Sequence, residues 1–323
     1  MTLFGNAAAH AAFAAAMRGG TLHHAWLLVG PEGVGKASFA RMAAQRLLAE
    51  AAGAAGLPGG FAVPEGVQAR ALMEAGSHPD FRLLTRLAKD PDKPDQDIAR
   101  SITISQVRSL QPMFATRPSM GPRRIVLIDA VDDLERNGAN ALLKNLEEPP
   151  AGTVFLLVSH APGRLLPTIR SRCRLLRFGS LNDDDMAAAL RQHLPDAAKD
   201  DIAALVRTGD GAPGRALRYA GLDVAGLDAA IGAIAASGDP DNSRRARLAK
   251  TLAGKANADR YALFLERAAT MIAHEARTRS GVRLKAAIDA QAAARDLAGA
   301  ALGLSLDPQA TVFEMSGILA ALH

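Results

Sequence analysis

The sequence has little of three things: cysteine, aromatic side chains and uninterrupted apolar runs. Its single cysteine, Cys173, excludes an internal disulfide and a zinc site made of several cysteines. No stretch reaches the roughly 18 uncharged apolar residues that a membrane-spanning helix needs. The N-terminus also lacks a basic-then-apolar signal pattern. We therefore expect a cytoplasmic protein without a membrane partner.

The composition favours helices and more than one packed unit. Apolar residues make up 49% of the 323 residues and aromatic residues only 4%, while alanine-rich runs recur from His10 onwards. Alanine is the strongest helix former, and a chain of this length is expected to form two or three units. The net charge of +5 suits a phosphate-bearing partner, but over this length it is equally typical of ordinary solubility.

The first half alternates short apolar runs with helical patterns. The runs predict five strands, at residues 25–29, 80–84, 124–129, 153–158 and 175–178. Helical patterns follow most of them, among them residues 104–114 and 134–146. Strands separated by helices predict a parallel sheet covered on both faces, with ligands at the carboxyl ends of the strands.

Outside these runs, the sequence predicts one insertion and a helical second half. Residues 51–76 are rich in Ala, Gly and Pro without a steady period, which predicts a surface insertion or an ordered loop. After Gly179 only helical patterns remain. We expect an α/β domain at residues 1–179, a small helical domain at 180–222 and a helical bundle at 223–323.

A glycine loop follows the first predicted strand and precedes a helix. Residues 30–36 read GPEGVGK, which fits the phosphate-binding pattern G-x-x-x-x-G-K. Gly30, Gly33 and Gly35 let backbone N–H groups surround a phosphate, and Lys36 supplies a positive charge. The position that should bind Mg²⁺ through a Ser or Thr hydroxyl is an alanine, Ala37. Ser38 comes one residue later, where the helix turns its side chain by about 100°.

The strand that ends at Asp129 resembles the second nucleotide-binding motif. There a carboxylate at the strand tip contacts Mg²⁺ and an adjacent Glu polarises the attacking water, but the adjacent residue here is Ala130. We interpret Asp132 and Asp133, which lie in the turn, as helix caps. With Ala37 and Ala130 at two hydrolysis positions, we expect turnover to be nearly abolished, whereas phosphate binding is left possible.

Two further candidates follow the fourth and precede the fifth predicted strand. Ser159 is placed like a residue that senses the γ-phosphate, but a loop serine that caps local backbone fits equally well. Residues 165–173 read LLPTIRSRC. This stretch resembles the motif with which AAA+ clamp-loader subunits present an arginine to ATP on a neighbouring subunit, which implies that Arg172 is an arginine finger acting in trans. Basic residues contacting DNA backbone are the alternative interpretation of this stretch.

The resemblance to the bacterial AAA+ clamp-loader family covers most of the chain. It includes HAWLL at residues 24–28, SHPD at 77–80, ISQVR at 104–108 and NALLKNLEEPP at 140–150. It implies an α/β fold with a P-loop AAA+ parallel sheet flanked by helices, followed by a small helical lid domain and a C-terminal all-helical collar domain.

Three departures narrow the resemblance. Many relatives carry a four-cysteine zinc module before the SHPD motif, but residues 51–76 contain no cysteine, so no zinc is expected. Ala37 and Ala130 separate the chain from the hydrolysing gamma and tau subunits and match the delta-prime branch of the family. Gly214 stands where a hydrolysing subunit places a nucleotide-sensing arginine, with Arg215 one residue later. The resemblance implies ATP as the ligand of the glycine loop, and the sequence leaves open whether the loop still binds it.

The resemblance also implies a function and partners. We expect a subunit of a DNA polymerase III holoenzyme that is not the polymerase, in a ring with gamma or tau and delta subunits. This ring would load a sliding clamp on primed DNA. One alternative is an active ATPase of the gamma or tau type in which Ser38 and Asp132 replace the missing groups. Another is a basic DNA-binding module.

Overall fold

The computed structural model describes residues 2–20, 22–89, 98–304 and 306–323. By its internal contacts the chain forms two compact units. The first comprises Met1–His193 with Asp210–Arg215, and the second comprises Leu194–Gly209 with Ala216–His323. The three domains expected from the sequence, with their boundaries, stay a prediction.

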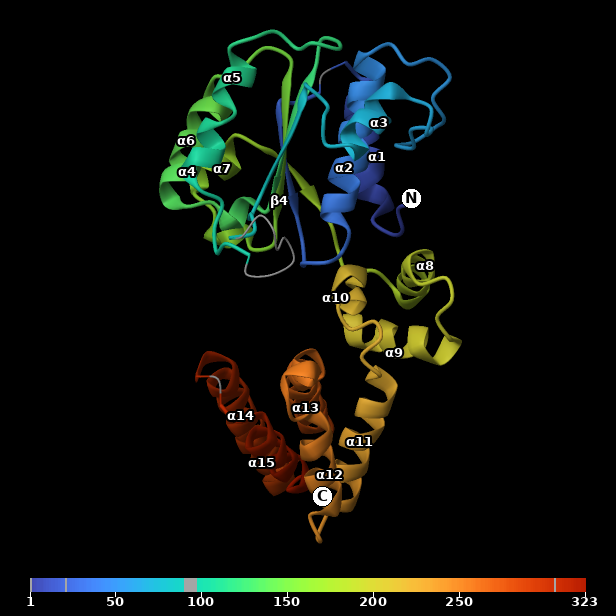
Figure 1. The fold of residues 1–323 in the computed structure, drawn as a ribbon, viewed down its shortest axis with the longest axis vertical. Helices are drawn as coiled ribbons and strands as arrows, with labels where there is room; N and C mark the ends of the chain where they lie inside the picture. Colours follow the sequence, from blue (N-terminus) through green and yellow to red (C-terminus); the bar gives the residue numbers. More distant parts are fainter. Residues whose placement is uncertain (1, 21, 90–97, 305) are drawn as a thin grey trace. The chain divides into compact units, whose positions relative to one another are not determined.

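The first unit is built on a five-stranded sheet (Figure 1). Its strands are β1 (Ala25–Val29), β2 (Phe81–Thr85), β3 (Arg124–Asp129), β4 (Thr153–Ser159) and β5 (Arg174–Arg177). Their order in the sheet is β2-β3-β4-β1-β5, and every pairing is parallel. The predicted parallel sheet is therefore confirmed, and its strand ends lie within one residue of the predicted ones.

Helices cover both faces of this sheet, as predicted. Figure 1 shows α1, α2 and α3 on one face and α4 to α7 on the other. Their bounds are α1 (Ala7–Arg18), α2 (Lys36–Ala51), α3 (Gln68–Glu74), α4 (Ile104–Arg108), α5 (Gln111–Phe114), α6 (Arg136–Glu147) and α7 (Pro167–Ser171). Short 3₁₀ turns at Val131–Asp133 and Pro162–Arg164 follow β3 and β4, and α8 (Asp183–His193) follows β5.

Strand β1 shows how the sheet contributes to two cores. Ala25, Leu27 and Val29 are buried in a cluster with residues of α4 to α7. Trp26 points to the other face, where its ring lies 4.8 Å from that of Phe13. Because successive side chains of a strand alternate between its faces, an all-apolar strand can be buried on both sides.

The scarce aromatic residues gather on the α1 and α2 face of the sheet. The ring of Phe39 lies 5.0 Å from Phe61, 5.3 Å from Phe178 and 5.5 Å from Phe13. Aromatic pairs at these distances add packing energy beyond the area that they bury. A few large rings thus compensate for the small alanine side chains of the two helices.

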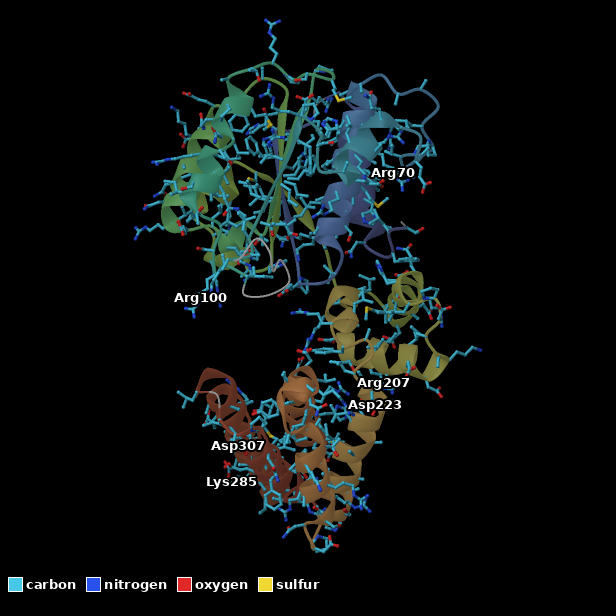
Figure 2. All side chains as sticks on the ribbon, in the orientation of Figure 1. Arg70, Arg100, Arg207, Asp223, Lys285 and Asp307 are labelled. Carbon is cyan, nitrogen blue, oxygen red and sulfur yellow. The ribbon has the colours of Figure 1, made fainter. Side chains whose placement is uncertain are left out.

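The segment at residues 51–76 differs from the expected surface insertion. It contains a helix, α3, and its Phe61 is 8% exposed in the aromatic cluster. Arg70, labelled in Figure 2, donates to the carbonyl oxygen of Val63 at 2.9 Å and so fixes the chain between them. An ordered loop was one of the two expectations, but the helix and the burial of Phe61 were not predicted, because one buried phenylalanine among Ala, Gly and Pro produces no periodic pattern.

The second unit contains helices only, within the part of the chain that the structure describes. They are α9 (Lys199–Gly209), α11 (Val224–Ser237), α12 (Ser243–Leu252), a 3₁₀ turn (Lys255–Asn257), α13 (Ala258–Thr278), α14 (Gly281–Leu304) and α15 (Pro308–Ala320), while α10 (Pro213–Leu217) begins in the first unit. Across the described residues, every helix lacks the length or the apolar content needed to cross a membrane.

Side-chain caps fix where several of these helices begin. Asp223 and Asp307, labelled in Figure 2, accept the N–H groups of Gly226 at 3.1 Å and Ala310 at 2.7 Å. Such caps satisfy backbone donors that have no partner within the helix.

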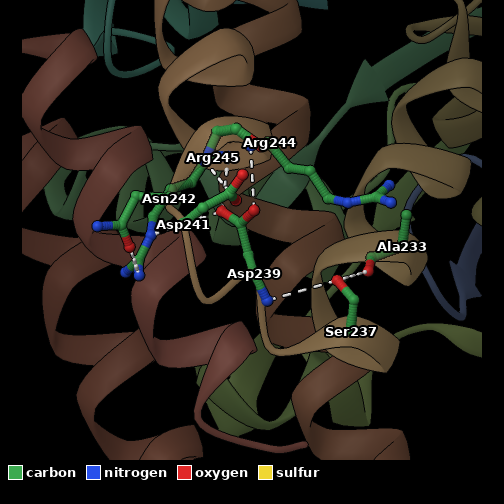
Figure 3. A network of polar contacts seen from close by, with 8 residues as sticks. Ala233, Ser237, Asp239, Asp241, Asn242, Arg244 and Arg245 are labelled. Carbon is green, nitrogen blue, oxygen red and sulfur yellow. Dashed lines mark hydrogen bonds and ion pairs between the residues drawn. The ribbon is translucent and has the colours of Figure 1, made fainter.

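Asp239 organises the start of α12 in the same way (Figure 3). It is 1% exposed, and its two carboxylate oxygens accept the N–H groups of Arg244 and Arg245, each at 3.0 Å. The turn at residues 238–240, between α11 and α12, is therefore fixed by hydrogen bonds from the backbone of α12.

The SHPD motif generates a stability prediction. Asp80 is 3% exposed, and its carboxylate accepts the N–H groups of Ser119 and Met120, each at 2.8 Å. Asp80→Ala leaves these donors without their partner, so we expect the free energy of unfolding of the first unit to fall by about 1–3 kcal/mol. The measurement is urea unfolding followed by fluorescence of Trp26, the only tryptophan of the chain.

Asp184→Ala is the control for that measurement. Asp184 is an exposed residue in the first turn of α8, so its removal should cost less than about 1 kcal/mol. Equal losses in the two variants would contradict a structural role for the Asp80 contacts.

Candidate functional site

The glycine loop lies between β1 and α2, as the pattern requires. Gly30 has a φ of 151°, and a Cβ there would lie 2.1 Å from the carbonyl oxygen of Phe178. Gly35 has a φ of 97° and immediately precedes α2. The first glycine is therefore required by close backbone approach and the last by the left-handed turn into the helix. The loop ends on the N-terminus of a 16-residue helix, which favours an anion.

Lys36 lies inside this loop and is 2% exposed. Its ammonium group donates to the carbonyl oxygens of Gly30 at 2.7 Å and Pro31 at 2.5 Å. Burial lowers the pKa of Lys36 to about 8, although the nearby carboxylates of Asp129 and Asp132 act in the opposite direction. The loop therefore fits a phosphate group, with a cation whose charge is retained at neutral pH.

Around the ammonium group of Lys36, some of the side chains that would bind Mg²⁺ and activate water are missing. Asp129 ends β3, and burial raises the pKa of its carboxyl group. Ala130 is 3% exposed, so the position next to Asp129 is filled by a buried methyl group. Ala37 and Ser38 are half-buried in the first turn of α2. No group of three His, Cys, Asp or Glu side chains that could hold a metal ion occurs among the described residues.

Asp132 has a different role from the predicted one. Its carboxylate accepts the hydroxyl of Ser159 at 2.9 Å and the N–H groups of His160 at 2.8 Å and Ala161 at 3.1 Å. The expected helix-capping role of Asp132 is therefore wrong: it fixes the loop after β4 because its turn lies at the same edge of the sheet. Asp133 pairs instead with Arg86 at 3.1 Å.

Ser159 and His160 both lie at this edge. Ser159 is completely buried, and its hydroxyl donates to Asp132. The residue therefore lies at the same end of the sheet as the glycine loop, but its hydroxyl already has a partner. The sequence did not single out His160. Its Nδ1 is buried without a hydrogen-bond partner in the described part of the chain, and burial lowers the pKa of its ring. The sequence around His160 contains no motif that would have marked it as a site residue.

The segment at residues 210–215 belongs to the first unit and packs against the glycine loop. The N–H of Gly214 donates to the carbonyl oxygen of Gly33 at 2.8 Å. A Cβ on Gly33 would lie 2.7 Å from the backbone nitrogen of Arg215, and a Cβ on Gly214 would lie 3.0 Å from Cα of Gly33. Backbone packs on backbone where the resemblance places a nucleotide-sensing arginine in hydrolysing subunits.

Arg172 lies elsewhere, at the end of α7 and before β5. Its Nη1 donates to the carbonyl oxygen of Thr168 at 2.9 Å and lies 3.4 Å from the hydroxyl oxygen of Ser171. Its Nη2 forms an ion pair of 2.7 Å with Glu147, the last residue of α6.

A cavity of about 490 Å³ lies beside the Arg172 guanidinium. It is lined by His23, His24, Leu146, Glu147, Ser171, Arg172, Cys173 and Arg174. Burial raises the pKa of the Cys173 thiol to about 12, so the thiol stays protonated at neutral pH and is not a nucleophile.

The glycine loop and Arg172 lie at opposite edges of the sheet. Strands β1 and β5 are parallel, and Trp26 pairs with Arg174, so Arg172 lies beyond the amino ends of both strands. The glycine loop begins at Gly30, four residues after Trp26, and so lies on the order of 13 Å away along the strand direction. The predicted site residues therefore form two groups, with Gly30, Gly33, Gly35, Lys36, Ser38, Asp129 and Ser159 near one edge and Arg172 at the other.

A family model and several curated proteins are similar to part of this chain. A family model described as "DNA polymerase III, delta subunit" matches residues 5–182. DNA polymerase III subunit delta' of Pseudomonas aeruginosa is 37% identical over 201 residues, which are 62% of this chain and 57% of that protein. DNA polymerase III subunit gamma of Buchnera aphidicola subsp. Schizaphis graminum is 33% identical over 175 residues, 54% of this chain and 43% of that protein.

A solved structure resembles the chain over more of its length. A DNA polymerase III gamma subunit-related protein from Thermotoga maritima is 16% identical, with a TM-score of 0.47, and the match covers 95% of this chain and 98% of that one. The chain spans about half the length of the curated relatives that it matches.

The buried lysine generates a pH prediction. A group with a pKa of about 8 is about nine-tenths charged at pH 7 and about one-tenth charged at pH 9. If only the ammonium form of Lys36 binds phosphate, the affinity for inorganic triphosphate should fall about tenfold between these pH values. Isothermal titration calorimetry without Mg²⁺ measures this.

Two variants test that assignment. Lys36→Met should bind triphosphate weakly and without this fall, whereas Lys144→Met, which removes an exposed lysine of α6, should behave like the native chain. A fall that persists in Lys36→Met would assign the titration to another group.

Proposed function

Because the chain belongs to the DNA polymerase III delta-subunit family, we propose that it acts as a delta-prime subunit of a clamp loader. In this role it joins gamma or tau and delta subunits in a ring. The ring uses ATP to open a sliding clamp and place it on primed DNA. The chain supplies Arg172 to the ATP site of a neighbouring subunit and does not hydrolyse ATP itself.

The position of Arg172 carries this proposal. Arg172 lies at the amino edge of the sheet, whereas Lys36 follows its carboxyl edge, so the arginine is out of reach of the chain's own glycine loop. The guanidinium instead borders an open cavity at the surface of the first unit. A fixed guanidinium that meets phosphate from another chain stabilises the charge that develops during phosphoryl transfer.

Three positions around the loop support the absence of hydrolysis. Ala37 and Ala130 have no group that could bind Mg²⁺ or polarise water. The contact between Gly33 and Gly214 is tight: a Cβ on Gly214 would lie 3.0 Å from Cα of Gly33, so a side chain at the sensing position would require the loop to shift. The loop retains a fit to phosphate, and ATP bound there would supply binding energy without turnover.

The helices of the C-terminal part support a role in assembly. We assign residues 180–222 to a lid domain and residues 223–323 to a collar that packs with neighbouring subunits. Helix α14 exposes large apolar side chains, with Val282 at 87%, Ile288 at 53% and Leu304 at 74%. These side chains would be removed from water if α14 packed against a neighbouring subunit.

An active ATPase of the gamma or tau type is the second candidate. It requires Asp132 to replace the missing catalytic carboxylate, but this side chain already accepts three hydrogen bonds from Ser159, His160 and Ala161. A basic DNA-binding module is the third candidate, supported by the exposed side chains of Arg170, Arg174 and Arg177.

Hydrolysis by a mixture of subunits tests the proposal. The chain alone should not hydrolyse ATP, and adding it to a purified gamma-type subunit should increase the turnover of that subunit. Arg172→Ala should reduce this increment by at least about tenfold, because the transition-state charge loses its cationic partner. Arg170→Ala, which removes an exposed arginine from the same helix, should leave the increment within about twofold of the native value.

Other results would select the alternatives. Turnover by the chain alone that disappears in Lys36→Ala would identify an active ATPase. An unchanged increment with Arg172→Ala would rule out the arginine finger. Tight binding of DNA by the isolated chain, with a steep dependence on salt, would favour the DNA-binding module.

A further inference from the structure

Two contacts within the chain hold the Arg172 guanidinium, which we propose acts on ATP bound by another subunit. One side is its own helix, through the carbonyl oxygen of Thr168. The other is Glu147 at the end of α6, with 2.7 Å between Nη2 and Oε1. Two elements that are separate in the sequence therefore fix one side chain.

The end of α6 is itself fixed. Leu142 and Leu146 are completely or almost completely buried in the core cluster of the sheet. Nε2 of His24 lies 3.0 Å from the carbonyl oxygen of Leu146, and since a carbonyl only accepts, this nitrogen carries the proton. Glu147 follows directly, so its backbone is anchored both by apolar packing and by a hydrogen bond to the residue before β1.

These anchors matter because an arginine at a protein surface is mobile. The Arg172 side chain is 33% exposed, and the free rotation of such a side chain corresponds to roughly 2 kcal/mol of entropy. At 2.7 Å the opposite charges of Glu147 and Arg172 attract each other directly, which a neutral partner would not do. The carboxylate of Glu147 is therefore better suited than an amide or a hydroxyl to restrict the guanidinium.

The same contacts leave donors for a phosphate. A guanidinium has five N–H groups. The hydrogen bonds recorded among the described residues come from Nη1 alone, to Thr168 and Ser171, and the ion pair with Glu147 involves Nη2. The Nε–H group has no recorded contact in the described part of the chain, so it can donate to a phosphate while the ion pair is intact.

We propose that Glu147 is a positioning residue that holds Arg172 in the orientation in which it meets the neighbour's ATP. This inference rests on the proposed function, because it assigns the residue that presents the finger. Glu147 acts through Arg172 and does not touch the nucleotide. Its loss should lower the turnover of the neighbouring site more than the affinity of that site for ATP, since orientation contributes to kcat.

The test measures how much the 323-residue chain increases the rate of ATP hydrolysis by a gamma-type subunit, at a series of ATP concentrations. Glu147→Ala should lower kcat of this increment by about tenfold and change KM by less than about twofold, because a guanidinium misplaced by about 1 Å loses much of its effect. Glu147→Gln keeps an oxygen at the same place but loses the negative charge, so it should restore kcat only in part, to a value between those of Glu147→Ala and the native chain. Size-exclusion chromatography checks that each variant still assembles.

Two further variants show whether the effect passes through Arg172. Glu148→Gln removes the charge of the adjacent, exposed glutamate and should leave kcat within about twofold of the native value. In an Arg172→Ala background, Glu147→Ala should have no additional effect, because non-additivity identifies residues that act as a unit.

The outcomes separate this inference from the proposed function. If Arg172→Ala abolishes the increment but Glu147→Ala leaves it unchanged or raises it, Arg172 is the finger and Glu147 does not position it. A rise would mean that the carboxylate competes with phosphate for the guanidinium. If Arg172→Ala has no effect, the proposed function itself is wrong. Additive losses in the double variant would also overturn the positioning role.

Discussion

The parallel direction of the strands is the constraint on which the rest of the molecule depends. Because β1 and β5 run the same way and pair Trp26 with Arg174, residues before these strands lie at one edge and residues after them at the other. The glycine loop follows β1, whereas Arg172 precedes β5. No change of rotamer spans the length of a strand, so the phosphate cradle and the arginine of one chain belong to different sites.

The glycine loop also makes contacts that fix its own backbone. Lys36 fills the loop from within by hydrogen bonds to the carbonyl oxygens of Gly30 and Pro31, and Gly33 carries the contact to Gly214. A bulky arginine at residue 214 would separate these backbones. The close packing of residues 210–215 on the loop therefore depends on glycine at both contact positions, Gly33 and Gly214.

Sequence patterns predicted what depends on periodicity and missed what depends on long-range contacts. The five strands could be located because each is a short apolar run between turn residues, and their parallel pairing followed from the intervening helices. The burial of Phe61 within residues 51–76 escaped prediction because it depends on one side chain that packs into a cluster of residues distant in the sequence. The role of Asp132 escaped for the same reason, since its partners Ser159, His160 and Ala161 are brought to it only by the pairing of β3 with β4.

The helical signature at residues 140–150 acquires a physical explanation in this structure. An amphipathic helix needs only its buried face, which Leu142 and Leu146 provide. The polar end has contacts of its own: the carbonyl oxygen of Leu146 meets His24, and Glu147 meets Arg172. The two prolines that follow prevent the helix from continuing, so Glu147 stands at a defined end rather than within another turn. The rigidity of the sheet core is thereby transmitted to a charged group at the surface, which is the condition for acting on a site in another subunit.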